Sequence, residues 1–275
     1  MRLLTLILLG FALVFAPTNP VQAESTLEIV KKRGKLLAGV RKKVPNFGMA
    51  NEKGEIVGFD VEIAKGIAAK LGVDIELVPV TSSTRTALLQ QGRIDLIAAT
   101  MTHYRKRDPS VDFSVGYFYS PQTLLVAKNS GISGMKDMAG KRAGTAIGAG
   151  AVENMKKVQS KITVQTFEGY PEAFLALQQG LIDAVGTDIV ILAGLRAKAQ
   201  KPNDFVIVPG ATFGGGEYGI GLRENDSDWR DAVNHALMDM WKDGTWMKAF
   251  NMWIGPGTQL NMKFEEMGFK MHTWR

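Results

Sequence analysis

The sequence contains no cysteine among its 275 residues. This absence excludes a disulfide framework, a zinc–thiolate site, a thiol nucleophile and lipid attachment through an N-terminal cysteine. Stability must therefore come from the hydrophobic core alone, and a chain of this length can form one large domain or two modest ones.

Histidine is also scarce, with only three residues, at positions 103, 235 and 272. They form no pair at catalytic spacing, and no group of histidines and carboxylates has the spacing of metal ligands. We therefore expect neither a metal nor a cofactor.

Long hydrophobic runs are missing except at the N-terminus. There, Arg2 precedes an apolar run from Leu3 to Phe15, and Val21-Gln22-Ala23 comes directly before Glu24. This pattern is typical of a secretory signal peptide, residues 1–23, that is cleaved before Glu24. Because the run is shorter than the roughly 20 residues that span a bilayer, we expect a soluble, exported protein.

The excess of positive charge is not concentrated in any one segment. The chain has 33 basic and 27 acidic residues, a net charge of +6, and its basic clusters at 31–33 and 41–43 fit solvated faces. This distribution argues against nucleic-acid binding and is compatible with a small anionic ligand.

The first part of the chain alternates short apolar runs with segments of helical periodicity. We expect strands at Leu36–Val40, Asp74–Val80 and Ile94–Ala99, with helices over 58–71 and 81–91 between them. This βαβαβ order predicts a mostly parallel sheet with right-handed crossovers. The expected helix N-caps are polar residues, Asp60 for the first helix and Thr81, Ser82 or Ser83 for the second.

Polar side chains follow the carboxyl ends of these strands. Arg41 follows the first strand, and Thr100 and Thr102 follow the third, with Arg107 shortly after. Ligands of open α/β sheets bind at this edge, where unpaired backbone N–H groups are exposed. Arg85 lies in the first turn of a helix, where the dipole disfavours a cation. An anion bound nearby would explain it.

Several blocks of the sequence resemble the periplasmic solute-binding proteins for polar amino acids, which are the receptors of ATP-driven importers. The blocks are GFDVEIAKGIAAKL at 58–71, IDLIAATMTHYRKRDPSVDFS at 94–114, and the shorter motifs Gly140-Lys141, Ile182-Asp183-Ala184, Glu217-Tyr218-Gly219-Ile220 and Gly244-Thr245-Trp246. They occur in the same order and extend over nearly the whole chain after residue 23.

The resemblance implies the type II fold of periplasmic binding proteins, an α/β fold. In it, two Rossmann-like lobes with mixed, mainly parallel sheets are joined by two hinge strands. We expect lobe 1 at 24–118 plus 217–275 and lobe 2 at 119–216, with glycines 214–216 supplying backbone freedom at the return crossing. It also implies a monomeric periplasmic receptor that delivers an amino acid to an inner-membrane ABC permease and is not an enzyme.

The same resemblance assigns the groups that read the amino-acid backbone. Arg107 would hold the α-carboxylate with two parallel charge-assisted hydrogen bonds, aided by Thr102 and by the backbone N–H of Gly150. The carbonyl of Thr100 and the carboxylate of Asp188 would meet the ammonium. From its position alone, Asp188 could equally be the N-cap of the helix that follows it.

Side-chain selectivity depends on a second set of residues. Arg41 and Arg85 match arginines of the glutamate/aspartate-binding branch, where they face the ligand's side-chain carboxylate. Tyr170 would donate through its hydroxyl, and Phe47 would either line the pocket or pack in the core. The expected ligand is therefore glutamate or aspartate.

Two alternatives remain open. Glutamine or asparagine would leave Arg41 and Arg85 facing a neutral amide. Since this fold also carries periplasmic dehydratases, an enzyme is the second alternative. His103 is its obvious general acid, although we expect that side chain to face solvent or the packing between lobes.

Overall fold

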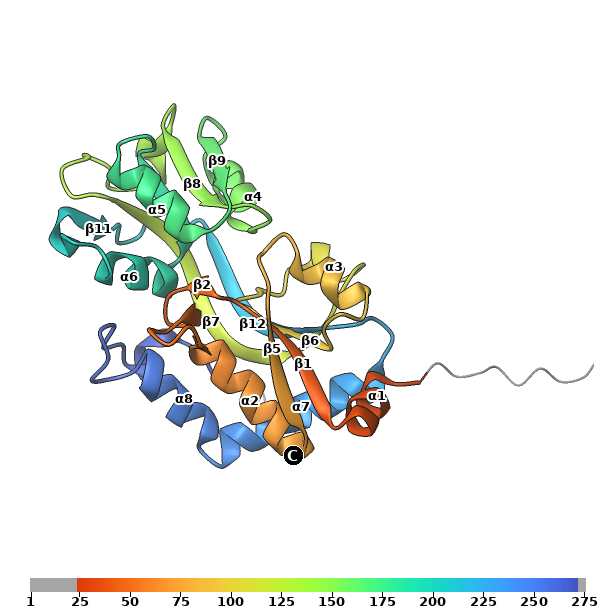
Figure 1. Ribbon diagram of the computed structural model, residues 1–275. Helices are drawn as coiled ribbons and strands as arrows, with labels where there is room; N and C mark the ends of the chain where they lie inside the picture. The colour runs from red at the N-terminus through yellow and green to blue at the C-terminus, as the bar shows by residue number, and fades with distance from the viewer. Residues whose placement is uncertain (1–23, 272–275) are drawn as a thin grey trace, which may run out of the picture.

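The computed structural model describes residues 24–271 as two groups of helices and strands joined by two long strands (Figure 1). The proposed signal peptide and His272 lie outside the described residues. Within residues 24–271, every helix is too short or too polar to cross a bilayer.

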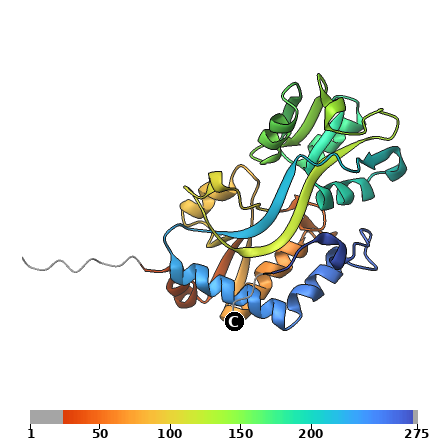
Figure 2. The ribbon, with the colours of Figure 1, turned by 180° about the vertical axis from the view of Figure 1, so that it is seen from behind.

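The two joining strands are β7 (Asp112–Ala127) and β12 (Gly214–Leu222), which pair antiparallel along most of their length. Figure 2 shows them side by side through both groups. We name the group at one end lobe 1. Its elements are α1 (Thr26–Arg33), β1 (Lys35–Val40), β2 (Lys43–Val44), β3 (Gly48–Ala50), β4 (Ile56–Val57), α2 (Phe59–Leu71), β5 (Asp74–Pro79), α3 (Arg85–Gln90), β6 (Leu96–Ala98), α7 (Ser227–Lys242) and α8 (Thr245–Trp253).

The group at the other end is lobe 2. It consists of β8 (Arg142–Ala146), α4 (Ala151–Val158), β9 (Thr163–Phe167), α5 (Tyr170–Gln178), β10 (Ala184–Asp188), α6 (Ile189–Ala197) and β11 (Phe205–Ile207). Short 3₁₀ turns complete the chain at Arg105–Arg107, Met135–Met138, Pro202–Asp204 and Phe264–Met267.

The main sheet of the described residues is mixed. Its order is β5-β1-β6-β12-β7-β10-β8-β9, with β11 paired to β7. Pairs within β5-β1-β6 and β10-β8-β9 are parallel, whereas all pairs made by β7 and β12 are antiparallel. The expected parallel βαβαβ unit is confirmed. The lobe boundaries stay a prediction, because β7 and β12 run continuously through both lobes.

The helix ends agree with the sequence at the C-termini but not at the N-termini. Gly34 and Gly72 adopt the left-handed conformation after α1 and α2, with φ of 67° and 68°. However, Asp60 does not cap α2, because Gly58 holds the N-cap position and the Asp60 side chain turns inward. The caps expected at 81–83 are also wrong, since 82–84 form a turn and α3 begins only at Arg85.

Phe47 belongs to an aromatic cluster between the crossing strands and the helices of lobe 1. Its ring centroid lies 5.2 Å from that of Phe118 and 5.7 Å from that of Tyr218, and Phe59 packs beside them against Trp246. All five rings are fully buried. The core role considered for Phe47 is therefore confirmed.

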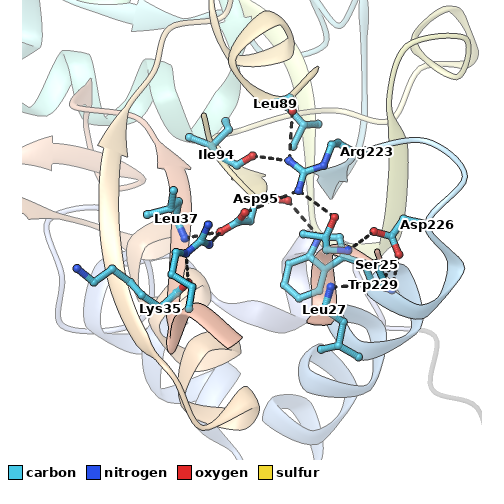
Figure 3. Close-up of polar contacts among 12 residues, drawn as sticks. Ser25, Leu27, Lys35, Leu37, Leu89, Ile94, Asp95, Arg223, Asp226 and Trp229 are labelled. Carbon is cyan, nitrogen blue, oxygen red and sulfur yellow. Dashed lines mark hydrogen bonds and ion pairs between the residues drawn. The ribbon is translucent and has the colours of Figure 1, made fainter. Parts of the chain in front are cut away.

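A polar network around Asp95 connects the N-terminal segment of lobe 1 to the segment that returns to this lobe late in the sequence (Figure 3). The Asp95 carboxylate is buried and accepts a hydrogen bond of 2.7 Å from the Leu37 backbone N–H and another from the Arg33 guanidinium. Arg223 forms a longer ion pair of 3.7 Å with it, and the Trp229 indole donates to its backbone carbonyl. The Asp95 carboxylate thus joins α1 and β1 to Arg223, and its backbone carbonyl adds α7, all at the start of β6.

Candidate functional site

The Arg107 guanidinium is fixed by contacts within lobe 1. Its Nη1 donates to the Thr102 carbonyl, and its Cζ lies 5.1 Å from the centroid of the Tyr104 ring. Thr102 is buried, and its backbone forms an isolated antiparallel β-bridge with Tyr218 on β12. Burial lowers the pKa of Arg107, and nearby Tyr104, Tyr170 and Asp188 oppose that shift. The guanidinium is thus held in place beside groups of both lobes.

Thr100 has an unusual backbone conformation that its neighbours hold in place. Its φ is +49°, a value that costs energy for a β-branched residue. Its N–H donates to Asp60 Oδ2 over 2.7 Å, its hydroxyl donates to the Ala99 carbonyl, and its own carbonyl accepts from Arg85 at 3.3 Å. The strained turn after β6 is therefore held by hydrogen bonds to Asp60 and to Arg85.

Arg85 and Arg41 are both buried beside this turn, and each makes hydrogen bonds within lobe 1. Arg85 Nη1 donates to the carbonyls of Ala99 and Thr100, so one arm of the guanidinium supports the backbone. Arg41 donates to Ser82 Oγ at 2.9 Å, and its Cζ lies 5.8 Å from the centre of the Tyr170 ring. The Nε of each arginine has no hydrogen-bond partner among the described residues.

The three arginines lie close enough to repel one another. Burial lowers the pKa of Arg85, and the charges of Arg107 and Arg41 lower it further. Tyr170, the first residue of α5 in lobe 2, lies close enough to raise the pKa of both Arg85 and Arg107. This positive region therefore lies between the lobes, where an anionic group would relieve the repulsion.

Asp60 is a counter-charge that sequence reasoning took for a helix cap. It is fully buried and accepts a 2.8 Å hydrogen bond from the Tyr117 hydroxyl besides the one from Thr100. Burial raises its pKa to about 7, although both hydrogen bonds and the charges of Arg41 and Arg85 oppose the shift. In the sequence, Asp60 belongs to the GFD motif that contributes to the family resemblance, and this motif was the feature that could have indicated a role at the site.

Asp188 contributes a carboxylate from lobe 2. It occupies the N-cap position of α6, as the capping alternative expected, although its side chain makes no capping hydrogen bond. Oδ2 accepts from the Thr187 hydroxyl at 3.2 Å, while Oδ1 and the neighbouring Tyr218 hydroxyl have no well-formed partner among the described residues. Burial raises the pKa of Asp188 to about 6, against the effects of Tyr218 and Thr187.

The two lobes are in contact along the edges of this region. Lys43 of lobe 1 lies 3.1 Å from both Glu168 and Glu172 of lobe 2, and Lys106 forms an ion pair of 2.6 Å with Glu153. A cavity of about 190 Å³ is bounded by residues of both lobes, among them Arg41, Val80, Glu168 and Tyr170. The structure therefore represents a closed arrangement.

Gly150 lies between the lobes, whereas His103 lies on the surface of lobe 1. Gly150 starts α4 and packs on the Tyr104 ring, so it belongs to the inter-lobe region as expected from its position. His103 is exposed, lies 2.7 Å from Asp108 and stacks on Phe113, with ring centroids 4.3 Å apart. The side chain considered as a general acid thus makes its contacts at the surface of lobe 1. Among residues 24–271, no three potential metal ligands gather.

Comparisons with known proteins agree with this geometry. Residues 36–256 match the family model of the bacterial extracellular solute-binding proteins, family 3. A glutamine-binding protein of Geobacillus stearothermophilus is 46% identical over 217 residues, which cover 77% of this chain and 81% of the relative. An L-glutamate/L-aspartate-binding protein of Pseudomonas aeruginosa is 28% identical over 269 residues, covering 92% and 88%.

Solved structures show the same fold. An ancestral arginine-binding protein, solved once with glutamine and once with arginine, is 39% identical to the chain in each structure. Each superposition has a TM-score of 0.75 and covers 81% of this chain and 99% of the other. The type II fold of periplasmic binding proteins, expected from the sequence, is confirmed.

Proposed function

Since the chain belongs to family 3 of the bacterial extracellular solute-binding proteins and serves an amino-acid ABC importer, we propose that its ligand is L-glutamine, enclosed between the lobes. The single observation that carries this proposal is the 46% identity to a glutamine-binding protein, against 28% to a glutamate/aspartate-binding one. The acidic branch expected from Arg41 and Arg85 has no comparable support.

The amino-acid backbone of the ligand would bridge the two lobes. Arg107 would take the α-carboxylate together with Thr102 and the N–H of Gly150, and Asp188 would take the ammonium. Oδ1 of Asp188 has no well-formed hydrogen bond among residues 24–271, which fits this role, because a buried carboxylate oxygen needs a donor. Since Arg107 and Asp188 come from different lobes, a bound zwitterion would stabilise the closed state.

The side-chain amide would lie toward Arg41, Arg85 and Asp60. An amide both accepts and donates, and this region offers buried guanidinium donors as well as a buried carboxylate acceptor. The hydrogen bonds from Arg85 to the Ala99 and Thr100 carbonyls already commit part of its guanidinium to the protein. Both features support a neutral, polar side chain.

Glutamate is the second candidate, and the charge of the site favours it. Among residues 24–271, two buried aspartates, Asp60 and Asp188, lie close enough to act on the charges of Arg41, Arg85 and Arg107. A zwitterionic ligand leaves this excess of positive charge uncompensated, whereas the extra carboxylate of glutamate would neutralise it.

A calorimetric titration of the protein with separate L-amino acids tests the ligand. We expect glutamine to bind, with glutamate, aspartate, asparagine and arginine binding at least roughly tenfold more weakly, a difference of about 1.4 kcal/mol. Tight binding of glutamate with no heat from glutamine would reject the first candidate in favour of the second. Consumption of any ligand in the sample would indicate an enzyme.

Arg41→Met separates the two candidates by charge. If the side-chain group of the ligand is an amide, we expect glutamine affinity to fall by roughly threefold to tenfold, the effect of one lost hydrogen bond. If it is a carboxylate, the loss of a charge-assisted bond should weaken glutamate binding by roughly a hundredfold. Lys53→Met, at an exposed position in the turn between β3 and β4, is the control and should leave both affinities unchanged.

Acidification should weaken binding through Asp188. The pKa of the free carboxylate is raised to about 6 by burial, and a bound ammonium would lower it again. Binding below that pKa therefore requires the loss of a proton, so affinity should fall by about tenfold per pH unit below about pH 6 and stay level above about pH 7. Titrations across this range, repeated with Asp188→Asn, check the assignment. An equal acid dependence in the variant would contradict it.

Binding without catalysis is the activity that these features support. The relatives reported above are named as binding proteins, and the contacts of His103 are at the surface. We further propose that the chain works in the periplasm as a monomer and delivers its ligand to an inner-membrane permease.

A further inference from the structure

Tyr104 lies between Arg107, which we propose binds the α-carboxylate of the ligand, and lobe 2. The Arg107 guanidinium rests over its ring, at 5.1 Å from Cζ to the ring centroid. An aromatic ring attracts a cation placed over its face, and this attraction grows where water is excluded. Tyr104 is partly buried, so its ring helps to hold the guanidinium in one orientation.

The hydroxyl of the same residue contacts lobe 2. It accepts a hydrogen bond of 3.0 Å from Nδ2 of Asn154, which lies on α4. That amide nitrogen also donates to Gln122 Oε1, at 2.9 Å, on the crossing strand β7. One asparagine thus links a loop of lobe 1 to the strand that joins the lobes.

Two glycines make the room for these contacts. A Cβ on Gly150 would lie 2.4 Å from a carbon of the Tyr104 ring, and a Cβ on Gly214 would lie 2.6 Å from Asn154 Nδ2. Real Cβ atoms do not approach other atoms so closely, so any larger residue would push Tyr104 or Asn154 away. The contact between lobes is therefore closely fitted at both of its ends.

Resting on the function proposed above, we propose that Tyr104 is a positioning residue that couples Arg107 to lobe closure. Its ring orients the guanidinium that receives the α-carboxylate, and its hydroxyl binds Asn154 only when the lobes are closed. The residue therefore lengthens the lifetime of the closed, ligand-bound state. The interaction forms after the ligand has entered, so it acts on dissociation and not on association.

Stopped-flow kinetics with L-glutamine, and with L-glutamate in parallel, test this role in the full chain. We expect Tyr104→Phe, which keeps the ring, to speed dissociation by roughly threefold to tenfold and to leave the association rate within about twofold. Tyr104→Leu, which also removes the ring, should speed it by roughly tenfold to a hundredfold. Tyr119→Phe, which removes a hydroxyl without a polar contact among the described residues, is the matched control.

The pairing with Asn154 is tested from the other lobe. Asn154→Ala should speed dissociation about as much as Tyr104→Phe, and the double variant should be no faster than the Asn154 variant alone. Additive effects, an unchanged dissociation rate, or a slowed association rate would overturn the inference. If the unmodified protein binds neither amino acid, the proposed function fails instead, so the two failures are distinguishable.

Discussion

Replacing Asp188 with asparagine should weaken glutamine binding at neutral pH by at least roughly thirtyfold without destabilising the unliganded protein. Truncating one partner of a buried charge pair typically costs about 2–5 kcal/mol of binding free energy, or roughly thirtyfold to several thousandfold. Asp188 is buried, and its Oδ1 has no well-formed hydrogen bond within the described part of the chain, so the proposed ammonium contact has these properties. Calorimetric titration gives the affinity.

The stability of the same variant provides the second half of the prediction. Because the pKa of Asp188 is raised to about 6, the folded state binds its proton more tightly than the unfolded state does. Its contribution to stability therefore falls as the pH rises from about 4 to about 6 and is lowest at neutral pH. Asparagine removes that cost, so the unliganded melting temperature at neutral pH should be equal or higher.

A control and a contrary result complete this test. Asp204→Asn changes an exposed carboxylate on lobe 2 and should alter neither affinity nor melting temperature. Glutamine binding by Asp188→Asn within about threefold of the unmodified protein would show that this carboxylate does not meet the ammonium.

Replacing Asp95 with alanine should have the largest effect on stability, about 3–5 kcal/mol. The change leaves the Leu37 N–H without its acceptor and deprives Arg33 and Arg223 of their shared counter-charge. For a chain of this size, such a loss lowers the melting temperature by roughly 10 °C. Thermal and urea denaturation of the unliganded protein measure it.

The matched control for Asp95 is Asp74→Ala, since Asp74 is exposed on the neighbouring strand β5. It should change stability by less than about 0.5 kcal/mol. A similar stability for the two variants would mean that the arginines around Asp95 contribute nothing through this carboxylate. Asp95→Asn should fall between the two, because an amide oxygen can still accept from Leu37.

The elements of lobe 1 could be predicted because their patterns are local. The apolar run at 36–40 and the helical spacing at 58–71 depend on near neighbours in the chain, and both elements formed as expected. The partners of Asp60 could not be predicted in this way. Its carboxylate meets Thr100 and Tyr117, 40 and 57 positions away, and no periodicity records contacts at such separations.

The candidate site shows the same limit. Resemblance indicated that Arg85 and Asp188 matter, but a matched residue type does not show where its hydrogen bonds go. Arg85 supports the backbone after β6, while Oδ1 of Asp188 makes no well-formed hydrogen bond with any described residue. Tyr104 and Asn154 were missed because they meet only across the lobes, 50 positions apart in the sequence.

The contacts around Asp95 and Asp226 also set an order of events while the chain is made. Ser25 and Thr26 bind Asp226, 201 and 200 positions later, and Arg223 reaches back to Thr26 and Asp95. A chain made from its N-terminus cannot form these bonds until residue 226 has been added. All residues of lobe 2 are then already present and can fold, whereas the first stretch of lobe 1 must wait for its partners. The segment that is made first is thus completed last.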